Sequence, residues 1–341
     1  MAFSVTDLAL GARAGAEIDR ICAWLRETVL GTLKRRGVVL GLSGGIDSSV
    51  VAALAARAFG ADKVLGLFMN EGESADDTAR LAQLAASHLG IATIDEDISP
   101  MLAAAGCYAR RDDAIRSVIP RYAAGWKCKI VLPSVLDSDR YRIYSVVVRS
   151  PDGEELSARM SPTAYLQVVA ATSFKQRTRK MLEYFHADRL IYAVAGTPNL
   201  LEYDQGFFVK NGDGAADVKP IAHLYKTQVY ELAGALGVPE EIRRRPPTTD
   251  TYSLPQSQEE FYFSLPYQGM DACLYGRNRG IPAAEVAAAL GLTAEQIERV
   301  YRDIDGKRAG ARYLHSPPAT VPSPVTQLQG ASMSSTETPP R

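Results

Sequence analysis

The segment Ser43-Gly44-Gly45-Ile46-Asp47-Ser48-Ser49 constrains the fold of this chain more than any other feature of the sequence. An apolar run at residues 37–42 precedes it and predicts a buried parallel strand, whereas residues 46–58 have the pattern of a helix. Glycines in such a turn let the backbone approach an anion, toward which the free N–H groups at the helix start point. The serine hydroxyls of the segment add donors, and Asp47 can hold Mg2+. The segment therefore predicts a phosphate-binding turn; the simpler alternative is a turn whose Ser and Asp side chains only cap the helix.

Strands and helices alternate along the chain. Strands are expected at residues 63–69 and 91–95, with a helix at 76–89 between them. Further elements are a strand at 190–195 and helices at 18–25, 162–185, 229–236, 283–290 and 293–304. This alternation, with short connections, predicts an α/β fold in which helices flank a parallel sheet.

Two regions depart from this pattern. Residues 141–149 and 155–160 flank Pro151-Asp152-Gly153, a turn signal that predicts a β-hairpin. From residue 316 the sequence is rich in Pro, Ser and Thr, and we expect residues 316–341 to be a disordered tail. Residues 1–315 are expected to form a single domain.

Composition narrows the possible partners and location. The 341 residues are 46% hydrophobic, which is enough for a sizeable core. Their formal net charge is −1, so there is no overall excess of basic residues that would indicate a nucleic-acid partner. No apolar run is long enough to span a bilayer, and no signal peptide is visible. The scattered cysteines form no CxxC pair, which fits a reducing cytoplasm and argues against a structural metal; they are Cys22, Cys107, Cys128 and Cys273. We therefore expect a cytoplasmic protein without a nucleic-acid or membrane partner.

Residues 43–49 resemble the pyrophosphate loop of the N-type ATP pyrophosphatases. That superfamily has an adenine-nucleotide α-hydrolase-like, Rossmann-like fold, and it activates substrates as adenylates while releasing pyrophosphate. The Gly-Lys-Ser/Thr ending of a Walker loop is absent here, so simple transfer of the γ-phosphate is not expected. Because the superfamily includes several synthetases and tRNA-modifying enzymes, the loop indicates the ATP chemistry but not the second substrate.

A second block of motifs indicates one family within that superfamily. The block consists of GTPNLLE at 196–202, GFFVKNGDGAAD at 206–217, KPI at 219–221, LYK at 224–226 and RPPT at 245–248. It resembles the ammonia-dependent NAD+ synthase family, and the resemblance covers most of residues 15–310. The family implies that ATP adenylates the carboxylate of nicotinate adenine dinucleotide, that ammonia then displaces AMP, and that the enzyme is a homodimer. Only a short helical stretch precedes the loop, so we expect free ammonia or a separate glutaminase to supply the nitrogen.

The resemblance assigns roles to individual positions. Asp47 and Glu202 would hold Mg2+, and Lys226 would reach the phosphates, which makes Asp47 and Lys226 the candidate catalytic residues. ATP contacts fall on Gly41, Leu42, Ser43, Gly44, Gly45, Ile46, Asp47, Ser48, Thr197, Lys226 and Thr248. Contacts to the dinucleotide fall on Arg177, Lys210, Asp217 and Lys307.

The sequence departs from the family pattern on the substrate side. Gly306 stands where the family has a histidine before Lys307, the segment after Gln258 differs, and residues 128–161 form an insert that contains the predicted hairpin. A paralogous AMP-forming amide ligase acting on another carboxylate is therefore the nearest alternative. A tRNA-modifying enzyme is less consistent with the sequence, because catalytic cysteine pairs and a basic appendage are missing. A silent nucleotide-binding module would not need the acidic and basic residues at positions 47, 202 and 226.

Overall fold

The structure is a computed structural model that describes residues 3–74, 76–133, 136, 143–247, 251–263 and 265–321. Thr248, one of the expected ATP contacts, and most of the expected tail lie outside the described residues.

The central element is a parallel sheet of four strands in the order β3-β2-β1-β7. The strands are β1 (Val38–Gly41), β2 (Val64–Phe68), β3 (Ala92–Asp95) and β7 (Ala193–Val194). Val39 of β1 lies opposite Leu65 of β2 on one side and Val194 of β7 on the other. The four predicted parallel strands are thus confirmed, although β7 is shorter than residues 190–195 because the preceding helix continues to Leu190.

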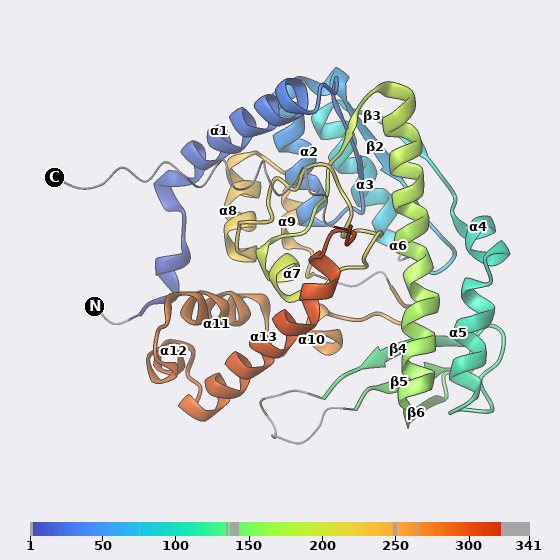
Figure 1. Cartoon of the computed structure of the whole chain (residues 1–341). Coiled ribbons are helices and arrows are strands. Elements are labelled where there is room, and N and C mark those ends of the chain that lie inside the picture. The colour runs from blue at the N-terminus through green and yellow to red at the C-terminus, as the bar shows by residue number, and fades with distance from the viewer. Residues whose placement is uncertain are drawn as a thin grey trace.

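Helices cover both faces of this sheet (Figure 1). Val38 and Leu40 point to one face, where they join a core with α1 (Ala14–Leu25), α2 (Ile46–Phe59) and α8 (Lys226–Ala235). Val39 points to the other face, against α6 (Pro162–Leu190). Successive side chains of a pleated strand point to opposite faces of the sheet. Because both faces are buried here, residues 38–40 are all apolar.

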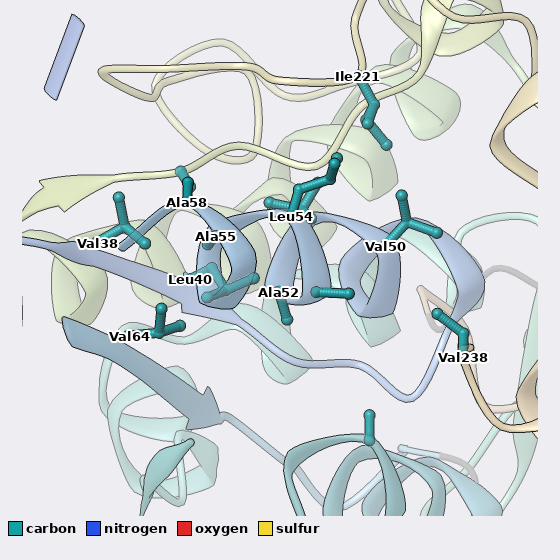
Figure 2. Close-up of a cluster of buried hydrophobic side chains, with 14 of the residues drawn as sticks. Val38, Leu40, Val50, Ala52, Leu54, Ala55, Ala58, Val64, Ile221 and Val238 are labelled. Carbon is teal, nitrogen blue, oxygen red and sulfur yellow. The ribbon is translucent and has the colours of Figure 1, made fainter. Parts of the chain in front are cut away.

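Helix α2 is enclosed by the first of these cores. Figure 2 shows Val50, Leu54 and Ala58 directed to one side of α2, and Val38 and Leu40 of β1 beside the helix. Because residues 50–55 are all buried, the helix is apolar around most of its circumference rather than along one stripe.

The other helices complete the layers. They are α3 (Asp76–Leu89), α4 (Ser99–Ala104), α5 (Cys107–Arg116), α7 (Leu200–Gln205), α9 (Glu240–Arg244), α10 (Gln258–Phe261), α11 (Tyr267–Arg279), α12 (Ala283–Leu290) and α13 (Ala294–His315). The short helical segments are η1 (Val5–Leu8), η2 (Gly11–Arg13), the π-helical η3 (Arg26–Thr32) and η4 (Ala61–Lys63). Helix α13 extends well beyond the predicted end at residue 304, and with α11 and α12 it encloses a separate core. No described helix is both long and apolar enough to cross a membrane.

A second, antiparallel sheet lies beside the N-terminal end of α6 (Figure 1). Its strands are β4 (Lys127–Val131), β5 (Ser145–Arg149) and β6 (Glu155–Arg159), in that order. The predicted hairpin is therefore confirmed as β5 and β6, joined by a turn in which Gly153 has a φ of +94°. Strand β4 was not predicted, because the alternation in residues 127–131 is too short to distinguish a strand from a loop.

Truncation of Leu54 tests the importance of the core around α2. Leu54 has no exposed surface, so Leu54→Ala should lower the free energy of unfolding by about 2–5 kcal/mol. Leu30→Ala is the matched control, since Leu30 is 41% exposed. Urea unfolding of both variants measures the difference, and equal losses would contradict this description of the core.

Candidate active site

The order of the strands creates a crevice at the carboxyl ends of β1 and β7. From β1 the chain proceeds to β2 and β3 on one side, then returns to β7 on the other side of β1. The segments that leave β1 and β7 therefore diverge to opposite sides. A position where the strand order reverses in this way is a topological switch point, and open α/β sheets bind their ligands there. A cavity of about 460 Å3 lies at this point, with both the 43–48 loop and residues 195–198 in its wall.

The loop after β1 is fixed by its glycines and serines. Gly44 has a φ of +65°, and a Cβ atom there would lie 2.7 Å from Cβ of Leu81 in α3 and 2.8 Å from the carbonyl oxygen of Thr78. The hydroxyls of Ser43 and Ser48 lie 3.2 Å apart. No side-chain hydrogen bond caps the first turn of α2, so its first N–H groups have no side-chain acceptor, and residues 45–48 of this turn line the cavity. This geometry suits an anion.

A cluster of charged and amide side chains lies beside the loop. Asp47 forms an ion pair with Lys226, whose side chain is 2% exposed, at the first residue of α8. The Nδ2 atom of Asn199 donates to Asp47 at 3.1 Å, and the Nε2 atom of Gln258 donates to Glu202 at 2.9 Å. Asn199 and Glu202 also cap α7 reciprocally, which fixes Glu202 beside Asp47.

The electrostatics of this cluster follow from its desolvation. Desolvation of Glu202 and the negative charge of Asp47 raise the pKa of Glu202 to about 7. Desolvation lowers the pKa of Lys226, but the carboxylates of Asp47 and Glu202 outweigh it and hold that pKa above its ordinary value. Lys226 therefore stays charged. Near neutral pH, a cation would compete with a proton for the carboxylate of Glu202.

The model of the NAD synthase family matches residues 17–117 and 146–309. The chain belongs to this family. It is 64% identical over 311 residues to the NH(3)-dependent NAD(+) synthetase of Mesorhizobium japonicum, covering 91% of this chain and 97% of that relative. Its identity to the enzyme of that name from Rhizobium meliloti is 60%, covering 92% and 93%.

Solved structures share the fold at lower identity. The NMN synthetase from Francisella tularensis has a TM-score of 0.62 at 22% identity, covering 90% of this chain and 98% of its own. An NH3-dependent NAD synthetase from Campylobacter jejuni has a TM-score of 0.58 at 20% identity, covering 91% and 99%. These likenesses support the α/β fold expected for an NAD synthase.

The residues for which the NAD synthase motifs imply ATP and metal contacts gather at one site. Those that line the cavity are Gly41, Leu42, Ser43, Gly45, Ile46, Asp47, Ser48, Thr197, Glu202 and Lys226. Gly44 is not part of the lining, because it packs against α3.

The residues expected to bind the dinucleotide are placed differently, and none of them lines the cavity. Lys210 donates to the carbonyl oxygen of Tyr313 at 2.7 Å, and Lys307 donates to that of Tyr262 at 2.6 Å. Asp217 accepts from the backbone N–H of Val194 at 2.8 Å. The Nε atom of Arg177, on an exposed part of α6, donates to the backbone of Lys210 at 3.3 Å.

Sequence reasoning missed several polar residues of the site. Asn199 could have been found, because Asn-x-x-Glu before a helical segment is a capping signal. Gln258 could not, because it reaches Glu202 only through the tertiary fold. The same holds for Lys180 and Glu183, a buried pair on α6 with Nζ and Oε2 2.5 Å apart. Burial raises the pKa of Glu183, although Lys180 opposes this effect.

Gly44→Ala tests whether the contact between the loop and α3 is as tight as described. A positive φ alone costs a residue with a Cβ about 1–2 kcal/mol. Gly11→Ala is the matched control. Gly11 also has a positive φ, of +53°, but an added Cβ there would have no atom within 4 Å, so only the backbone cost applies. We expect Gly44→Ala to lower both the unfolding free energy and the affinity for ATP more than Gly11→Ala does. Urea unfolding and calorimetric titration measure both, and identical behaviour of the variants would contradict the contact.

Proposed function

We propose that this chain is an ammonia-dependent NAD+ synthase. ATP would adenylate the carboxylate of nicotinate adenine dinucleotide and release pyrophosphate, and ammonia would then displace AMP to leave the amide. The observation that carries this proposal is the shared cavity of the 43–48 loop with Asp47, Glu202 and Lys226, in a chain 64% identical to an NH(3)-dependent NAD(+) synthetase.

The chemistry requires positioning and charge stabilisation rather than a protein nucleophile. A carboxylate oxygen of the substrate attacks the α-phosphorus of ATP, the bond from that phosphorus to the pyrophosphate oxygen breaks, and an acyl-adenylate forms. Nitrogen of ammonia then attacks the acyl carbon, AMP leaves, and a proton is released. Negative charge on the phosphates increases during the first step, and the loop N–H groups with the ammonium group of Lys226 are suited to stabilise it.

Mg2+ is the cation that this donor set fits. Asp47 and Glu202 offer hard oxygen ligands, and Glu202 is desolvated next to another carboxylate, an arrangement that a cation would stabilise. Within the described residues, no group of three or more His, Cys, Asp or Glu side chains is placed to hold a metal ion. Two carboxylates are sufficient, because Mg2+ commonly binds through one or two carboxylates, substrate phosphates and water. When bound, the ion would neutralise phosphate charge.

A paralogous AMP-forming amide ligase acting on another carboxylate is the second candidate. It is favoured by the positions of Arg177, Lys210, Asp217 and Lys307 outside the cavity. The names of the two relatives at 64% and 60% identity support the NAD+ synthase instead.

An assay with Mg-ATP, an ammonium salt and nicotinate adenine dinucleotide tests the proposed reaction. We expect NAD+ and AMP in equal amounts, and Asp47→Ala should lower the rate at least ~100-fold because it removes a metal ligand and leaves Lys226 unpaired. Asp19→Ala is the control, since the side chain of Asp19 is 69% exposed and forms its ion pair with Arg57, which is also exposed. Neither AMP nor NAD+, in a protein that still binds ATP, would instead indicate another carboxylate substrate. Loss of activity when Mg2+ is chelated would support the metal.

The source of nitrogen and the cellular location complete the proposal. Free ammonia, or a separate glutaminase, would supply the nitrogen. A reducing cytoplasm fits the cysteines, which are all buried and free.

A homodimer is proposed because α6 exposes a long apolar face. Leu166, Met181 and Phe185 are 62%, 57% and 59% exposed, and their spacing places them on one side of the helix with Arg177. Such a face needs a partner, and a second copy would cover it and bring Arg177 to the interface.

Sedimentation tests this interface. We expect a dimer that Phe185→Asp converts to monomers, because a buried carboxylate without a partner is costly. Trp24→Asp, at a side chain that is 41% exposed on α1, should leave the dimer intact. A wild-type monomer, or dimers in both variants, would contradict the α6 interface.

A further inference from the structure

The cavity extends along most of α6. Its lining from this helix forms a single stripe, namely Tyr165, Val169, Thr172, Ser173, Gln176, Arg179, Lys180 and Glu183. At the rise of an α-helix, the stretch from residue 165 to residue 183 covers about 27 Å. The cavity is therefore elongated, and its two ends face different parts of the fold.

The two ends have opposite chemical character. At one end, Glu183 lies next to the carboxyl end of β1, since a Cβ at Gly41 would be 3.2 Å from its Oε1 atom. That end carries the charged groups and the phosphate-binding loop. The described lining of the other end is uncharged and mostly aromatic, with Tyr144, Tyr165, Tyr252 and Phe261. An uncharged aromatic wall suits a planar ring and not a phosphate.

The aromatic end is built with fixed geometry. The rings of Tyr144 and Tyr165 are stacked with centroids 4.2 Å apart and an interplanar angle of 13°. Tyr252 and Phe261 form an edge-to-face pair at 5.6 Å. These residues share one hydrophobic cluster with strands β4 and β5. Because the rings are held before any ligand arrives, binding would order few side chains.

The antiparallel sheet holds this end of the cavity in place. The N–H of Met160 donates to the carbonyl oxygen of Tyr144 at 2.9 Å, which fixes the backbone of Tyr144 at the start of β5. Cys128 of β4 donates its N–H to the hydroxyl of Ser253 at 2.9 Å, so the same sheet anchors the segment that carries Tyr252. The family model does not match residues 118–145. Tyr144 thus comes from a part of the chain that the family motifs do not describe.

We propose that the antiparallel sheet β4–β6 supplies an acceptor subsite in which Tyr144 contacts a planar heteroaromatic ring of the carboxylate substrate. The inference rests on the proposed function, which provides a substrate with such rings and places ATP at the opposite, charged end. The sheet would then determine affinity for the acceptor without affecting ATP.

Kinetics of variants at position 144 test the subsite. Tyr144→Ala and Tyr144→Leu should each raise KM for nicotinate adenine dinucleotide about tenfold, the usual effect of losing one stacked ring. KM for ATP should change less than about twofold, and Tyr144→Phe should resemble the wild type. Trp126→Ala is the matched control, because Trp126 packs in the same hydrophobic cluster but does not line the cavity.

The outcomes separate this inference from the proposed function. The subsite would be overturned if Tyr144→Ala and Trp126→Ala raised KM for the dinucleotide equally, or if Tyr144→Ala left this KM unchanged. Formation of NAD+ by the wild type would still support the proposed function in either case. A wild type that forms no NAD+ would overturn both. In calorimetric titration, the affinity of Tyr144→Ala for the dinucleotide should fall as its KM rises. Nicotinate mononucleotide, which lacks adenine, shows which ring Tyr144 contacts. If Tyr144→Ala binds both ligands more weakly than the wild type does, the contacted ring is the pyridine.

Discussion

The buried ion pair between Asp47 and Lys226 is the interaction on which the site depends. It joins the loop after β1 to the first residue of α8, two segments far apart in the sequence. A charge buried without its partner costs about 3–5 kcal/mol, so each side chain fixes the position of the other. Asp271 of α11 strengthens the arrangement, because it accepts the N–H of Thr227 at 2.7 Å and so holds the start of α8. The C-terminal helices thereby support the site without lining it.

A second set of buried charges fixes the wall formed by α6. Lys175, which is 1% exposed, donates to Glu71 at 2.6 Å and to Glu73 at 2.7 Å, both in the segment after β2. It also donates to the carbonyl oxygen of Thr251 at 3.1 Å. Because these hydrogen bonds are charge-assisted, α6 and two other segments around the cavity are held together. Ion pairs therefore hold both the loop after β1 and the α6 wall of the site in place.

The parts of this structure that could be predicted from the sequence are those defined by local backbone geometry. The 43–49 loop is contiguous, so its glycine and serine pattern indicates both the turn and its ligand class. Residues whose role depends on distant segments could not be found in this way: Gln258 reaches Glu202, and Tyr144 stacks on Tyr165, only after the chain has folded. The lengths of β7 and α13 were misjudged for a related reason, since tertiary packing rather than local propensity sets where α6 and α13 end.

The three regions in which the sequence was expected to depart from the family pattern are physically connected. Strand β4 lies in the stretch that the family model leaves unmatched, and the carbonyl oxygen of Ile130 in it accepts from Gln256, just before Gln258. A few residues further along the chain, the carbonyl oxygen of Tyr262 accepts from Lys307, the residue next to Gly306. Since Tyr262 also lines the cavity, strand β4, the segment around Tyr262 and α13 form one continuous layer beside the cavity. Gly306 is open to this kind of change, because an added Cβ would meet nothing within 4 Å. Gln258 joins this layer to Glu202, a metal-ligand candidate, so the substrate side of the cavity and its charged end are linked by a direct hydrogen bond.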